Sequence, residues 1–310
     1  MSHVAADQLA RFLAYQRAFD GHDAQRFFMA HWELPLVLVA AYLAVVALGP
    51  RLMERRPAFS LRRVTLAWNV SVALFSLSGA AVCVPHLAAR IRSHGFWFTV
   101  CGDVYELAGY GAPAFWASLF TWSKLLELID TVLLVLKKRP VITLHWFHHA
   151  SVILFAWAAW AYETPCALWY GAMNYAVHAL MYSYFALMAT RCRPTVARFA
   201  PAVTALQIAQ FGVGTLVNIV AAASYFSASV GCAIQPEILH IQGVMYVAYG
   251  ALFVQLFYAR YLDGKRAQEA VDAASKRRAK QREKQPADDW SYTPMVDTMG
   301  KQGRPGGKID

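Results

Sequence analysis

The chain has 310 residues, of which 58% are apolar and 15% are charged. This composition excludes an ordinary soluble domain of the same length and indicates an integral membrane protein. The net charge of +10 does not indicate a nucleic-acid partner, because no basic patch is interleaved with exposed aromatic residues.

The apolar residues come in blocks of about 20, the length that a helix needs to cross a bilayer. Residues 1–30 contain charges and no early apolar core, so we expect a non-cytosolic segment there rather than a signal peptide. A membrane domain of seven transmembrane helices is predicted over 31–263, and a basic, largely disordered tail over 264–310. The predicted spans are 34–53, 64–88, 113–136, 142–162, 166–190, 200–224 and 237–261.

Basic residues are concentrated in alternate loops between these spans. Short loops rich in Lys and Arg stay on the cytosolic side of a membrane, so the C-terminus is predicted to be cytosolic and the N-terminus to lie on the other side. The basic loops contain Arg51, Arg55, Arg56, Arg62 and Arg63, then Lys137, Lys138 and Arg139, then Arg191, Arg193 and Arg198, and finally Lys276, Arg277, Arg278 and Lys280.

Three of the five cysteines, Cys101, Cys166 and Cys232, fall at or near the non-cytosolic side. An oxidising compartment on that side would allow a disulfide. We favour Cys101–Cys232, which would join the loop between spans two and three to the loop between spans six and seven. Spacing alone leaves all three pairs open.

Polar and ionisable side chains at membrane depth mark functional candidates, and here four spans contain them. Within each span they recur every three or four residues, so they share one helical face. Lipid cannot satisfy such faces, which must therefore turn toward one another around a polar chamber near the cytosolic side. The faces consist of Lys124, Glu127, Asp130 and Thr131; His145, His148 and His149; Asn174, His178 and Tyr182; and Thr204, Gln207 and Gln210.

The histidine cluster allows interpretations without covalent chemistry. Interhelical hydrogen bonds alone could explain its polar residues. The HWFHH segment also looks like the histidine boxes of membrane di-iron desaturases and hydroxylases, but only four histidines lie in the cytosolic half, too few for two irons. A mononuclear site from His145, His148, His149 and His178 stays open. A receptor also has seven spans, but it needs no histidine cluster with acidic partners.

Acyl transfer is the third interpretation. Neutral imidazole is a good nucleophile toward a thioester, and the resulting acyl-imidazole can pass its acyl group on. Glu127 and Asp130 could orient a histidine and fix its tautomer. The basic cytosolic loops would hold a phosphorylated substrate at the mouth of the chamber.

Four sequence blocks resemble the ELO-type very-long-chain fatty acid elongases. Residues 124–138 resemble the family's K-x-x-E-L-x-D-T block, and HWFHH at 145–149 matches its histidine box. Residues 174–185 and 204–210 resemble its N-x-x-V-H-x-x-M-Y-x-Y-Y and T-x-x-Q-x-x-Q blocks. Phe147 and Phe185 stand where tyrosine is commoner. The form of these blocks is most similar to the branch that acts on saturated and monounsaturated chains.

The resemblance implies that an acyl-CoA and malonyl-CoA condense to a 3-oxoacyl-CoA, with loss of CO2 and CoA. It implies a barrel of spans two to seven around an acyl tunnel, in the endoplasmic reticulum membrane, with the N-terminus lumenal. It also implies other elongation-cycle enzymes as partners, and a homodimer is a candidate assembly. No cofactor or metal is expected beyond the two substrates. The lumen is oxidising, so the resemblance strengthens the pair Cys101–Cys232.

For the mechanism we expect a ping-pong route in which His148 carries the acyl group. His145 and His149 would orient it or move protons, and His178 with Asn174 would stabilise the enolate of malonyl-CoA. A ternary route, with His148 only as a base, stays open. Supporting roles are expected for Lys124, Glu127, Asp130, Thr131, Tyr182, Gln207 and Gln210, and CoA binding for Lys137, Lys138, Arg139, Arg191 and Arg193.

Overall fold

The computed structural model describes residues 3–227, 229 and 231–262, and the tail predicted over 264–310 lies outside this range. The described residues form helices, with a single isolated bridge between Asp20 and Tyr110 and no strand among them. The helices are α1 (His3–Arg17), α2 (Gly21–Ala30), α3 (Glu33–Met53), α4 (Arg62–Cys101), α5 (Val104–Ala108), α6 (Gly111–Leu126), α7 (Ile129–Leu136), α8 (Thr143–Ala161), α9 (Ala167–Met188), α10 (Arg193–Val196), η1 (Ala197–Phe199), α11 (Ala200–Tyr225), α12 (Pro236–Phe257) and η2 (Tyr258–Leu262).

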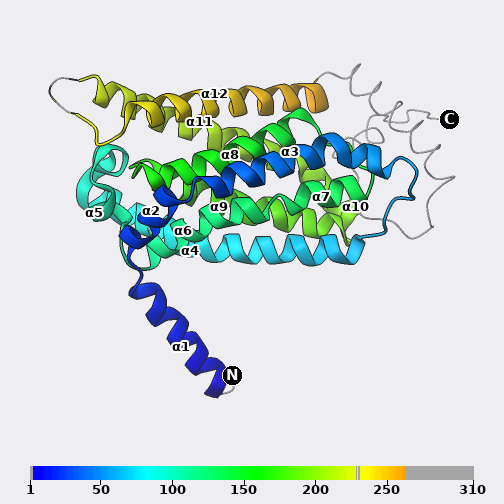
Figure 1. Cartoon of the computed structure of the whole chain (residues 1–310), viewed down its shortest axis with the longest axis horizontal. Coiled ribbons are helices and arrows are strands. Elements are labelled where there is room, and N and C mark those ends of the chain that lie inside the picture. Colours follow the sequence, from blue (N-terminus) through cyan, green and yellow to red (C-terminus); the bar gives the residue numbers. More distant parts are fainter. Residues whose placement is uncertain (1–2, 228, 230, 263–310) are drawn as a thin grey trace, which may run out of the picture.

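The long helices run side by side along the bundle, and α1 extends away from it (Figure 1). Four described stretches are long and apolar enough to cross a membrane: Glu33–Met53, Arg62–Cys101, Arg193–Tyr225 and Pro236–Leu262. The all-helical class is therefore confirmed, and the apolar helices fit a multi-pass membrane protein. The count of seven spans and their closure into a barrel stay predictions.

The helix α4 is much longer than the predicted span over 64–88. It contains 40 residues and has a kink at Gly95, whose φ of 82° lies in the left-handed region that glycine adopts without strain. Past the kink, Thr99 accepts a hydrogen bond from Trp169 Nε1, at 3.0 Å. The helix ends at Cys101, which forms a disulfide with Cys232.

The third predicted span, over 113–136, is divided into α6 and α7 by a break at Glu127 and Leu128. Around the break, Asp130 N donates to Glu127 O and Thr131 N donates to Leu128 O, so the backbone closes three-residue turns. The expectation of one continuous helix was wrong here. The break lies beside the buried Glu127 side chain, whose contacts are described below.

The helices α4 and α9 pack closely because Gly79 leaves room for a tyrosine. A Cβ added at Gly79 would lie 2.5 Å from the ring of Tyr175. Tyr175 is buried, and its hydroxyl donates to Trp116 O at 2.8 Å, so the ring has little freedom to move away. This glycine therefore sets the distance between the two helices.

Replacing Gly79 by alanine is expected to lower stability, although alanine is the better helix former. The clash with Tyr175 should cost about 1–3 kcal/mol. Gly243→Ala, on α12, is the matched control because a Cβ there meets nothing within 4 Å. Thermal unfolding in detergent should give a lower Tm for Gly79→Ala and an unchanged or higher Tm for Gly243→Ala. Equal midpoints would contradict this packing.

Candidate active site

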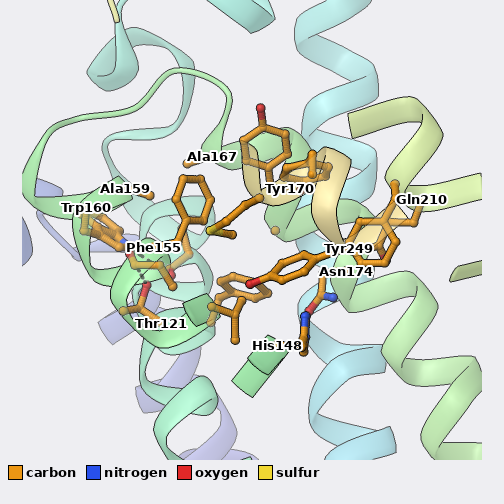
Figure 2. A pocket seen from close by; sticks show the side chains of 18 residues that line it. Thr121, His148, Phe155, Ala159, Trp160, Ala167, Tyr170, Asn174, Gln210 and Tyr249 are labelled. Atoms are coloured by element: carbon orange, nitrogen blue, oxygen red, sulfur yellow. Dashed lines mark hydrogen bonds between the residues drawn. The ribbon is translucent and has the colours of Figure 1, made fainter. Parts of the chain in front are cut away.

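A cavity lies between α6, α8, α9, α11 and α12. Its walls are mainly apolar and aromatic. Figure 2 shows His148, Asn174, Tyr249 and Gln210 toward one side, and Thr121, Phe155 and Trp160 toward the other. The cavity thus joins a polar region around His148 to an apolar region that reaches the last turn of α8.

A buried ion pair stands beside the polar end of the cavity. Lys124 Nζ donates to Glu127 Oε1 at 2.7 Å and to Asn174 Oδ1 at 2.9 Å, and it lies 4.3 Å from the centre of the Phe120 ring. Both charged side chains are less than 5% exposed. An ammonium group only donates, so it fixes the Asn174 amide with its oxygen toward Lys124 and its NH2 group on the other side.

Glu127 also connects the ion pair to α9. Its Oε1 accepts from Ser123 Oγ at 3.2 Å and lies 3.7 Å from His178 Nδ1. The second distance is too long for a hydrogen bond but close enough for attraction if the imidazole gains a proton. Glu127 can therefore stabilise positive charge on both Lys124 and His178.

Hydrogen bonding holds His145 outside the cavity wall. Its Nε2 lies 2.7 Å from Thr131 Oγ1, which in turn lies 3.1 Å from the hydroxyl of Tyr42 on α3. The His149 ring is buried, with its centre 4.5 Å from that of His145. The ring centres of His149 and His148 are 5.6 Å apart, so His149 packs between His145 and the histidine that lines the cavity.

Of the three histidines on α8, only His148 lines the cavity. Its Nδ1 is buried without a hydrogen-bond partner, so Nε2 is the ring nitrogen left for a substrate. The ring of Tyr249 packs against it, with centres 4.7 Å apart, and the Tyr249 hydroxyl lies 2.6 Å from Ser151 Oγ. His148 is thus held by packing while one nitrogen can react.

Asp130 belongs to a separate polar cluster. Its carboxylate accepts from Trp68 Nε1 at 2.6 Å and from the hydroxyl of Tyr182. Asp130 was expected to orient a histidine, but neither of these two partners is one. Asp130 therefore ties α7 to α4 and α9, while Glu127 is the carboxylate beside an imidazole.

The two glutamines of α11 have different surroundings. Gln207 Nε2 donates to Met181 Sδ at 3.0 Å, whereas Gln210 lines the cavity. The sequence places both on one face but does not distinguish them.

The basic residues gather at the end of the bundle where α7 and α10 lie (Figure 1). Lys137 is only 2% exposed and donates to Thr65 Oγ1 at 3.0 Å, unlike the expected open rim. Lys138 Nζ donates to Glu54 O, and Lys138 is partly exposed. The other residues that were expected to bind CoA also reach the surface, namely Arg139, Arg191 and Arg193.

Four further residues with polar contacts in this region were not predicted from the sequence, namely Tyr42, Trp68, Ser151 and Tyr249. Each lies in an apolar run without the charge or spacing that singled out the others. The polar atoms of these side chains become informative only when the helices are placed together. Among the described residues, no group of three His, Cys, Asp or Glu side chains is arranged to hold a metal ion.

The chain belongs to the GNS1/SUR4 family, the ELO family of fatty acid elongases, whose model matches residues 27–269. It is 35% identical over 272 residues to "Fatty acid elongase 3" of Trypanosoma brucei brucei, covering 80% of this chain and 90% of the relative. It is 36% identical over 247 residues to "Very long chain fatty acid elongase 4" of Trypanosoma cruzi, covering 79% of this chain and 86% of the relative. It is 35% identical over 252 residues to "Very long chain fatty acid elongase 6" of Drosophila melanogaster, covering 80% and 78%. The resemblance found in the sequence blocks is confirmed.

Breaking the Lys124–Glu127 pair should strongly reduce stability. Lys124→Met leaves a buried carboxylate without its cation, at a cost of about 3–5 kcal/mol. Adding Glu127→Gln removes that leftover charge and should recover part of the loss. Tm values in detergent for the single and double variants measure the loss of stability and its partial recovery.

Arg11→Met is the control for the ion-pair prediction. Arg11 pairs with Asp7 at 3.0 Å, but both side chains are more than half exposed, so its loss should change Tm little. Equal changes for Arg11→Met and Lys124→Met would show that the buried pair does not stabilise the bundle.

Proposed function

We propose that this elongase condenses a long-chain fatty acyl-CoA with malonyl-CoA, giving a 3-oxoacyl-CoA, CO2 and CoA. The cavity is the observation that carries this proposal. It joins one accessible histidine to a long apolar space, which suits a substrate with a reactive thioester and an apolar tail. The relatives' names, which specify fatty acid or very-long-chain fatty acid elongation, support the same substrate class.

The acyl tail would lie between α8, α9 and α12, with its thioester beside His148. His148 and Trp160 both line the cavity and are twelve residues apart on α8, or about 18 Å at 1.5 Å per residue. Phe155, Tyr170 and Tyr246 line the intervening space. A saturated or monounsaturated tail fits walls of this kind, because they offer apolar contact along the chain.

In the first half-reaction, His148 Nε2 attacks the thioester carbon. The new C–N bond forms, the C–S bond breaks, and CoA leaves as a thiolate that takes up the proton lost from Nδ1 of the acylated ring. His145 and His149 orient the His148 ring or move protons. The product is an acyl-imidazole, which is reactive enough to transfer its acyl group.

In the second half-reaction, malonyl-CoA loses CO2, and the electron pair of the broken C–C bond forms an enolate. The Asn174 NH2 group, fixed by Lys124, donates to the enolate oxygen, and His178 beside Glu127 stabilises its charge. The enolate carbon attacks the acyl carbon, the C–N bond to His148 breaks, and the departing imidazolate takes up a proton from solvent. The 3-oxoacyl-CoA leaves and the imidazole is restored.

We place the protein in the endoplasmic reticulum membrane with seven spans, the N-terminus lumenal and the C-terminus cytosolic. The basic loops in alternate positions support this orientation. Spans two to seven would form the barrel, with α3 outside it. The CoA phosphates would bind at the basic cytosolic end, where Lys138, Arg139, Arg191 and Arg193 reach the surface. The other elongation-cycle enzymes and a second copy of the chain are the proposed partners.

An acyl-transfer assay tests the ping-pong route directly. Purified protein in detergent is mixed with radiolabelled acyl-CoA and no malonyl-CoA. We expect stoichiometric CoA release with label kept on the protein. His148→Ala should abolish both and lower condensation by more than about 10³-fold, because it removes the nucleophile. His240→Ala, an exposed histidine at the start of α12, should retain both.

Other outcomes of this assay separate the mechanisms. No release without malonyl-CoA, followed by 3-oxoacyl-CoA once it is added, would keep the condensation and contradict the acyl-enzyme. No product under either condition, with iron or zinc found by elemental analysis, would contradict the condensation itself.

A further inference from the structure

Gln210 presents an amide to the cavity without a protein partner. Its side chain lines the cavity and is 8% exposed, and its Oε1 is buried with no hydrogen-bond partner. An unpaired buried polar atom costs about 1–3 kcal/mol. An apolar residue would avoid this cost, so the amide is informative about what the cavity binds.

Gln210 lies level with the polar groups of α9. The helices α9 and α11 are neighbours joined by a short connection and run in opposite directions, and Gln207 contacts Met181. Gln210 is nearly one turn farther along α11, which brings it level with His178 and toward Asn174 on α9. Figure 2 shows Gln210 on the same side of the cavity as Asn174 and His148.

Two amides therefore face the cavity near one nucleophile. Lys124 holds the Asn174 oxygen, so the Asn174 NH2 group is available to a substrate. Gln210 can turn its own NH2 group the same way, since no protein contact holds either end of its amide. Two donors on one side of a cavity that also contains an imidazole match the needs of a thioester carbonyl under attack.

We propose that Gln210 is a further substrate-binding residue. In the first half-reaction it donates its amide N–H, together with that of Asn174, to the carbonyl oxygen of the acyl thioester. Asn174 donates to the enolate oxygen only in the second half-reaction, after the first CoA has left. This inference rests on the proposed function. The inference goes beyond the proposed function because it assigns to Gln210, the second glutamine of α11, a direct contact with the acyl substrate. Gln207, whose amide is engaged with Met181, has no such role.

The test compares Gln210→Met with Gln255→Met, because methionine keeps the length of the side chain and removes the amide. Gln255 is an exposed glutamine of α12 that does not line the cavity. Gln210→Met should lower kcat/KM for acyl-CoA by about 10²-fold, the usual loss for one donor to an oxyanion. Gln255→Met should leave it unchanged. Gln210→Glu, which keeps the shape and loses the NH2 group, should show the same loss and serves if Gln210→Met fails to fold.

Binding of an S-alkyl-CoA thioether separates carbonyl recognition from a structural role. This analogue has the CoA and the tail but no carbonyl oxygen. Both Kd values are measured in a His148→Ala background, because a chain with His148 would take up the acyl group from acyl-CoA. In that background Gln210→Met should weaken binding of acyl-CoA and leave the Kd of the thioether unchanged. Equal weakening of both ligands, or a kcat/KM of Gln210→Met equal to that of Gln255→Met, would overturn the assignment. If the wild type makes no 3-oxoacyl-CoA, the proposed function fails, while the two Kd values still test the Gln210 contact.

Discussion

The buried pair of Lys124 and Glu127 is the interaction on which the candidate site depends. Taking either charge into a bundle costs several kcal/mol, which only a close and well-bonded partner offsets. The helix is broken where Glu127 lies, and the contact of 2.7 Å joins α6 to the start of that break. The same two side chains then reach α9 at Asn174 and His178. One ion pair thus connects the broken helix to the helix that holds Asn174 and His178.

The hydrogen bonds of the site divide its polar side chains into held and free groups. Lys124 holds the oxygen of Asn174, and Thr131 holds a ring nitrogen of His145. Gln210 lines the cavity together with His148, and its Oε1 has no protein partner. Because unpaired polar atoms are costly inside a protein, the Gln210 amide is a place where a substrate can complete the hydrogen bonding.

The sequence predicted the helical class, and it placed His148, Asn174 and Gln210, which line the cavity, on polar faces that turn toward one another. It could do so because polar residues spaced by three and four share a face, which lipid cannot satisfy. It missed the break at Glu127, since no proline or glycine lies there and the turn depends on tertiary contacts. It missed Tyr249, because an aromatic residue in an apolar span usually only packs. It also placed Lys137 at an open rim, whereas that side chain turns back to Thr65. In each case the deciding partner lies far away in the chain.

The two ends of the cavity are stabilised by different interactions. The apolar end is bordered by Ala167 and Tyr170, at the start of α9. The last turn of α4 supports that start, because Val100 O accepts from Cys166 Sγ at 3.3 Å and Cys101 is linked to Cys232. The reactive end depends instead on the ion pair. The polar end of the cavity is therefore held by electrostatic interactions, while the apolar end is held by a hydrogen bond to the last turn of α4, which the disulfide links to Cys232.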